Sequence, residues 1–207
     1  MGILGFIKSG KGSYNDGNAC LQMIVENWDV QNENRYEIFR TILDESKKYS
    51  DALHLLACAY ACHYSQADYR KQAIEYFEKY LKNPVPSNNV NFSLSTVYSD
   101  LGEDYESEYD FQNAERCYKL SILNCSDRHY STLTGQYDII PQEVKLGRLY
   151  LKISTQKAVD YWLGLMNYHE YKIGDANQSG FRRHVDIEYK KALEKHQNGY
   201  VYKPRKK

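Results

Sequence analysis

The chain has 207 residues, of which 42% are hydrophobic and 26% are charged, values typical of one globular domain with a sizeable core. Basic and acidic residues balance, so the formal net charge is zero. A protein that coats nucleic acid carries a positive excess, because each neutralised phosphate releases counterions, so the balance argues against that role. The five cysteines are an odd number with no recognisable leader sequence, which predicts reduced thiols and a cytoplasmic location.

The N-terminal stretch GFIKSGKGS, Gly5–Ser13, is within one residue of the phosphate-binding loop G-x-x-x-x-G-K-[ST]. Such a loop needs a buried strand before it, and a Ser or Thr directly after the lysine, but here Gly12 follows Lys11. We therefore expect no nucleotide site, and an irregular segment over residues 1–17. The apolar run at this end is too short for a signal or a membrane-spanning helix, so stable membrane insertion is not expected.

Apolar residues recur at three- and four-residue spacing along most of the chain, and this period predicts amphipathic helices. One such face carries Tyr69, Ala73, Phe77 and Tyr80, with Asp68 expected as its N-cap. The predicted helices cover, in chain order, residues 18–28, 33–48, 51–64, 68–82, 91–106, 111–124, 141–153, 155–173 and 180–196. Strand-like alternation is scarce and prolines number only four, so the predicted fold class is all-α.

The segment Tyr98–Ser126, YSDLGEDYESEYDFQNAERCYKLSILNCS, contains an ordered pattern of aromatic and small residues. The pattern consists of Tyr98, Leu101, Gly102, Tyr105, Phe111, Ala114 and Tyr118. It resembles the tetratricopeptide repeat (TPR), a pair of antiparallel helices. The small residues let the two helices approach closely, while the aromatic residues fill the space around the crossing.

Two further segments show the same pattern, which predicts repetition of the helix pair. The first has Leu56, Ala57, Tyr60, Ala73, Phe77 and Pro84 in these roles, and the second has Leu146, Gly147, Tyr150, Ala158 and Trp162. The resemblance implies an α-α solenoid of TPR-like antiparallel helix pairs with a C-terminal capping helix. The expected organisation is an irregular segment over 1–17, a degenerate leading helix pair over 18–49, three TPR-like pairs over 50–173, a capping helix over 174–198 and a disordered basic tail over 199–207.

The resemblance also implies a concave groove, lined by the first helix of each pair, in which an extended peptide or a partner helix lies. The positions expected to face it are His54, Cys58, Ser99, Glu103, Val144 and Arg148, with Leu151 one turn away. The charged side chains among them are expected to stay solvated until a partner arrives. The protein is therefore predicted to be a non-enzymatic scaffold that binds another protein or peptide.

Two other functions remain open at this point. One is a peptide-sensing regulator that changes superhelical pitch when a short ligand binds. The other is a nucleic-acid or membrane accessory protein that acts through its basic C-terminus, since residues 181–207 carry nine lysines and arginines against three acidic residues. A solvated cap with a disordered tail explains the same charges.

We expect no catalytic residue, no cofactor and no metal site. His54, Cys58 and Cys62 lie four residues apart along one helical face, but structural zinc normally takes four ligands and no second Cys/His pair is visible. An acidic run without lysine or arginine comprises Asp100, Glu103, Asp104, Glu106, Glu108 and Asp110. It lacks the ligand order of a calcium loop and predicts a solvated turn between two helices, or else a landing site for a basic partner.

Overall fold

The structure is a computed structural model, and it describes residues 17–29, 34–87, 90–125, 130–131, 136–137, 141–173 and 179–204. The GFIKSGKGS stretch and the last three residues of the basic tail lie outside this range. So does most of the connector between residues 126 and 140.

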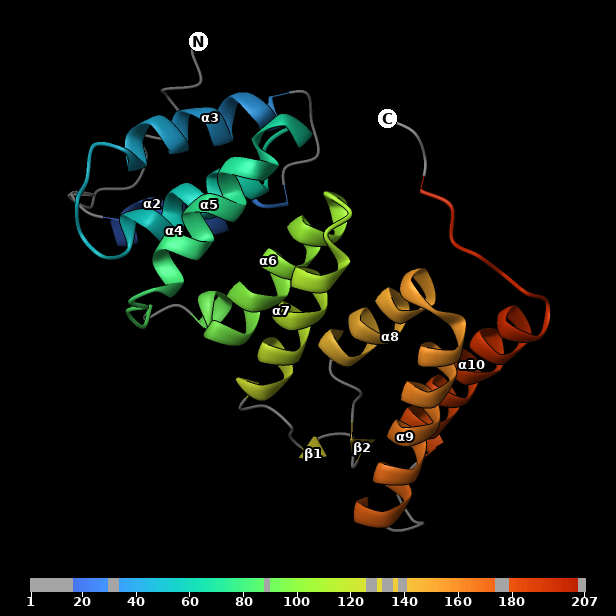
Figure 1. The fold of residues 1–207 in the computed structure, drawn as a ribbon. Helices are drawn as coiled ribbons and strands as arrows, with labels where there is room; N and C mark the ends of the chain where they lie inside the picture. The colour runs from blue at the N-terminus through green and yellow to red at the C-terminus, as the bar shows by residue number, and fades with distance from the viewer. Residues whose placement is uncertain are drawn as a thin grey trace. The chain divides into compact units, whose positions relative to one another are not determined.

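Helices account for most of the described residues, as the all-α prediction requires (Figure 1). In chain order they are α2 (Gly17–Asn27), α3 (Arg35–Ser46), α4 (His54–His63), the 3-10 helix η1 (Ala67–Tyr69), α5 (Arg70–Leu81), the 3-10 helix η2 (Val90–Phe92), α6 (Leu94–Ser107), α7 (Phe111–Leu123), α8 (Pro141–Ile153), α9 (Thr155–Ile173) and α10 (Ser179–Gln197). Two short strands, β1 (Tyr130–Ser131) and β2 (Gln136–Tyr137), pair antiparallel between α7 and α8 and were not predicted. The fold class is confirmed as antiparallel helix pairs.

Local capping chemistry explains where several helices begin. The side chains of Ser93 and Asp110 accept hydrogen bonds from the backbone N–H groups at the starts of α6 and α7. Pro141, which suits a first helical position because it lacks an N–H, begins α8 as predicted. The prediction that Asp68 caps α5 is wrong. Asp68 lies inside η1, Tyr69 occupies the N-cap position, and no side chain caps that helix.

The chain divides into two compact units, Met1–Glu108 and Tyr109–Lys207, which we call unit 1 and unit 2. The sequence predicts a single domain. The division falls between α6 and α7, inside the repeat identified at Tyr98–Ser126. The packing of each unit is therefore described separately.

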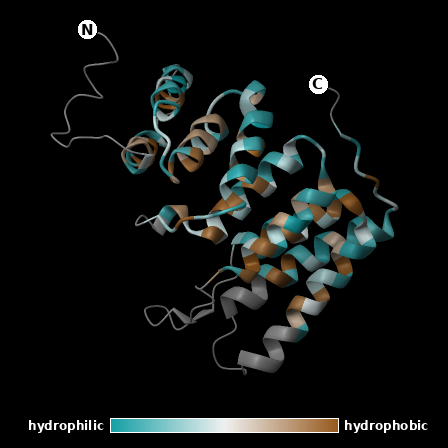
Figure 2. Ribbon diagram, turned by 60° about the vertical axis from the view of Figure 1, so that its left-hand side comes forward, coloured by the Kyte–Doolittle hydropathy of each residue, from teal (hydrophilic) through white to brown (hydrophobic). Residues whose placement is uncertain are grey.

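Unit 1 is built around α4, which contacts α2, α3 and α5. Residues 56–62 of α4 are all buried, as expected for a helix that is apolar on every side. By contrast, hydrophobic and hydrophilic residues alternate around most of the other helices (Figure 2). The Tyr60 ring packs edge-on against Phe77 at 5.1 Å and lies 4.8 Å from Phe92, so two aromatic positions of the repeat pattern meet in this core.

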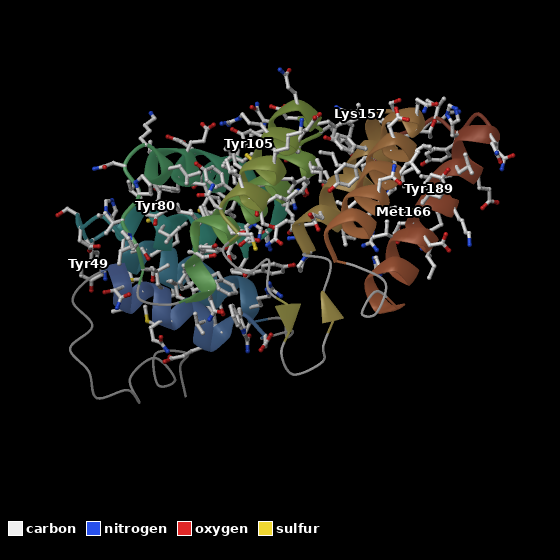
Figure 3. The ribbon with its side chains drawn as sticks, turned by 90° about the horizontal axis from the view of Figure 1, so that it is seen from below. Tyr49, Tyr80, Tyr105, Lys157, Met166 and Tyr189 are labelled. Atoms are coloured by element: carbon white, nitrogen blue, oxygen red, sulfur yellow. The ribbon has the colours of Figure 1, made fainter. Side chains whose placement is uncertain are left out.

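Unit 2 is organised around Trp162, which is fully buried between α9 and α8. A Cβ atom added to Gly147 of α8 would lie 2.5 Å from Cε2 of Trp162, so only glycine fits at this crossing. The small-residue explanation of the repeat pattern is thus confirmed for Gly147. Lys157, labelled in Figure 3, and Tyr150 both donate hydrogen bonds to Glu115, joining α9 and α8 to α7.

Candidate functional site

The predicted groove residues of unit 1 differ in exposure. Cys58 and Ser99 are buried, whereas His54 and Glu103 are half-buried. A ring nitrogen of His54 contacts the backbone carbonyl of Asp51, at the start of its own helix. Because α4 is covered by three helices, its middle is closed to a partner, and Glu103 on α6 is the accessible charge of this set.

In unit 2 the predicted residues lie on α8. Val144 is buried and Leu151 is half-buried, while the Arg148 side chain is 59% exposed. Nη2 of Arg148 donates to Glu188 of α10 at 3.4 Å, so Arg148 is already ion-paired and not simply solvated. Burial would raise the pKa of Glu188, but its pairing with Lys191 and Arg148 outweighs burial and lowers it. Arg148 therefore joins α8 to α10 as well as offering a surface charge.

Glu103 belongs to a cluster that sequence reasoning did not identify. A ring nitrogen of His63, at the end of α4, and carboxylate oxygens of Asp100 and Glu103, on α6, all lie within 4.8 Å of one another. All three side chains are half-buried. We call these three residues the His63 cluster. Asp100 and Glu103 are one helical turn apart, which places both carboxylates on the same side of α6.

The His63 imidazole is held in place by a buried carboxylate. Its Nδ1 lies 3.0 Å from Oδ2 of Asp104, whose side chain is only 5% exposed. The other oxygen of Asp104 lies 3.7 Å from Nε of Arg70. Burial would lower the pKa of His63, but the hydrogen bond and charge of Asp104, together with Asp100 and Glu103, outweigh it and raise that pKa. The prediction of a solvated turn is wrong here, since these acidic residues lie within α6 and one of them is buried.

Tyr60 of α4, and Tyr64, the residue that follows α4, lie beside the His63 cluster. Tyr60 is 1% exposed, and its hydroxyl has no hydrogen-bond partner in the described part of the chain. Burial and then the charge of Asp100 raise its pKa well above the usual value. The centre of its ring lies 6.3 Å from that of the His63 imidazole. Burial, Asp100 and Glu103 likewise raise the pKa of Tyr64. One buried and one half-buried phenol ring thus pack against His63, at 6.3 Å and 4.9 Å between ring centres.

Cys58 and Cys62, the two thiols on one face of α4, differ from the His63 cluster in their chemistry. Burial raises the pKa of Cys58 to about 11 and that of Cys62 to about 12. Thiolates, not thiols, bind metals, so this environment disfavours metal binding at these cysteines. Their burial in α4 agrees with a packing role.

Among the described residues of the C-terminus, three cations have partners within unit 2. Lys190 and Lys191 pair with Asp186 and Glu188, and Nζ of Lys195 lies 4.7 Å from the centre of the Tyr200 ring. The sequence predicts disorder from residue 199, yet Tyr202 packs against Phe111 at 6.0 Å. No helix in the described ranges is both long enough and apolar enough to span a membrane.

Comparisons with known proteins bear on the fold. No family model matches the chain. No curated protein matches it either. A crystal structure from Podosopora anserina, whose description reads "kinesin light chain nearly identical TPR-like repeats", is similar over 88% of each chain, with a TM-score of 0.62 and 11% sequence identity. At this identity the likeness concerns architecture alone, and it agrees with the repeat pattern found in the sequence. The chain therefore has the fold of a TPR-like helical repeat protein.

Proposed function

We propose that this protein is a non-enzymatic interaction scaffold that binds a peptide or a partner helix along the first helices of its TPR-like pairs. The observation that carries the proposal is the TPR-like fold itself, because such folds expose rows of first helices and serve protein binding in general. Glu103 on α6 and Arg148 on α8 support it, since both are charged side chains on first helices and both remain within reach of solvent.

The charge of α6 favours a basic partner for unit 1. Asp100, Glu103, Glu106 and Glu108 are all half-buried, and they belong to the acidic run that contains no lysine or arginine. Charge of one sign at a binding surface speeds association with a segment of the opposite sign, and it selects against wrong partners more than it adds affinity. A lysine- or arginine-rich segment is therefore the partner chemistry that this helix fits best.

The test is affinity capture from the native cell, comparing the wild-type protein with the double variant Glu103→Ala/Arg148→Ala. The double variant should recover less of the specific partners, while its helicity should be retained. Its stability cost should come mainly from Arg148, because that change removes one of two cations from the buried Glu188 carboxylate.

The matched control is Glu75→Ala/Lys119→Ala, which removes one acidic and one basic side chain from exposed positions on the second helices α5 and α7. It should recover partners like the wild type. Equal recovery by all three proteins would show that the first-helix positions do not carry binding. The single variants then separate the contributions of the two units.

A further inference from the structure

The His63 cluster has the donor set of a transition-metal site. It offers one imidazole nitrogen and two carboxylate oxygens within 4.8 Å of one another, all from unit 1. His63 lies in the last turn of α4, where the negative end of the helix dipole favours a positive charge. Magnesium and calcium prefer sites made only of oxygen, whereas a mixed nitrogen and oxygen set suits zinc and its neighbours in the periodic table.

The contact between His63 and Asp104 also supports a metal site. Metal-binding histidines almost always donate their second ring N–H to a carboxylate or a carbonyl, which fixes the tautomer and the ring orientation. With Nδ1 bonded to the buried Asp104 carboxylate at 3.0 Å, Nε2 is the nitrogen that keeps a lone pair for a cation. Arg70 in turn lies against the other oxygen of Asp104, so the orienting carboxylate is itself held in place.

Tyr60 supplies an independent observation. Its hydroxyl is buried and has no hydrogen-bond partner in the described residues, and the centre of its ring lies 6.3 Å from that of His63. A buried polar group without a protein partner is costly, and an ordered water or an ion beside it would offset that cost. A zinc ion with three protein ligands keeps a fourth position for water, and such a water is the kind of partner that this hydroxyl lacks.

We propose that His63, Asp100 and Glu103 bind one divalent transition-metal ion, with zinc the best match, and that Asp104 is the positioning residue that orients the imidazole. The ion would join the end of α4 to α6 and so stabilise unit 1. The sequence-based expectation of no metal site considered the Cys and His residues and the acidic run separately, each at local spacing, whereas these ligands come from two helices. This inference does not depend on the proposed scaffold function.

The experiment is a Zn²⁺ titration of the metal-stripped full chain in competition with a chromophoric zinc indicator. One saturable site per chain is expected, and Zn²⁺ should raise the melting temperature. Asp100→Asn and Glu103→Gln keep side-chain size, and each should weaken binding by about tenfold or more. Glu106→Gln, on the same helix but outside the cluster, should bind like the wild type. Failure to saturate below millimolar Zn²⁺, or equal affinity in all four proteins, would overturn the proposal.

A second measurement separates this site from the buried thiols. Co²⁺ used in place of Zn²⁺ should give weak d–d absorption without the intense thiolate charge-transfer band of a cysteine site. The variant Cys58→Ala/Cys62→Ala should keep the wild-type Zn²⁺ affinity. A charge-transfer band in the wild type, or loss of binding in the cysteine variant but not in Asp100→Asn, would assign the metal to the thiols and refute the His63 cluster.

Discussion

Glu115 of α7 provides a sharp test of the packing described for unit 2, through the substitution Glu115→Gln. Burial alone would raise the pKa of this carboxyl, but hydrogen bonds from Lys119, Lys157 and Tyr150 outweigh burial and lower the pKa from 4.5 to about 2. The folded protein therefore favours the ionised form, and this contributes stability that glutamine cannot supply in full.

The magnitude follows from the size of the pKa shift. A shift of about 2.5 units corresponds to about 3 kcal/mol at 1.36 kcal/mol per unit. Glu115 is 17% exposed, but Lys157 and Lys119 are 42% and 58% exposed, so solvent screening reduces this figure. We expect Glu115→Gln to lower the free energy of unfolding of unit 2 by about 1 to 2 kcal/mol at pH 7.

The assay is urea unfolding followed by tryptophan fluorescence in a Trp28→Phe background. The chain has two tryptophans, so the buried Trp162 then reports on unit 2 alone. A lowered folded-state pKa gives stability that is present above pH 5 and lost as the pH falls toward 2, so the difference between Glu115 and Gln should shrink over that window.

A control substitution, Glu75→Gln, removes a more exposed acidic residue that pairs with one lysine on the same helix of unit 1. Measured in a Trp162→Phe background with Trp28 as the probe, it should change stability by no more than about 0.5 kcal/mol. An equally small effect of Glu115→Gln, or an effect that does not depend on pH, would refute the reasoning.

Three further changes test other parts of the structure. Gly147→Ala should destabilise unit 2 by about 1 to 3 kcal/mol because its Cβ meets the Trp162 ring, whereas Gly164→Ala, on an open face of α9, should stabilise it by up to about 1 kcal/mol. Urea unfolding should therefore show changes of opposite sign in the free energy of unfolding, and equal changes would contradict the packing described for Gly147. Tyr60→Phe should raise the stability of the metal-free protein by about 1 kcal/mol in EDTA, since it removes an unpartnered buried hydroxyl, and a loss would show that the hydroxyl has a partner. Ending the chain after Lys203 should leave the melting temperature unchanged, while ending it after Gly199 should lower it by removing the contact of Tyr202 with Phe111; equal melting temperatures would show that this contact adds no stability.

The helix positions could be predicted from the sequence because apolar spacing and capping act locally. The two helices predicted over 141–153 and 155–173 have the observed bounds of α8 and α9, and Pro141 marks the first of them. The cap at Asp68 could not be read in the same way, because a 3-10 turn before α5 competes for the same residues. Local patterns thus locate helices well and their first residues less well.

The candidate site was predictable only in part, because it depends on contacts between helices. The groove rule selects Glu103, but His63 meets Asp104 across 41 residues of sequence, and no local spacing reveals such a pair. The rule also selects Cys58, which is buried. The unbroken apolar run of α4 was a visible signal that this helix would be covered on all sides.

The most direct test of the scaffold proposal is site-specific photo-crosslinking in the native cell. A photoreactive amino acid replaces Glu103 on α6 or Arg148 on α8, both first helices. In matched proteins it replaces Glu75 on α5 or Lys119 on α7, exposed positions on second helices. The account predicts discrete crosslinked partner bands from position 103, position 148 or both, with no such bands from positions 75 and 119. Crosslinks that form only from the second helices would contradict it.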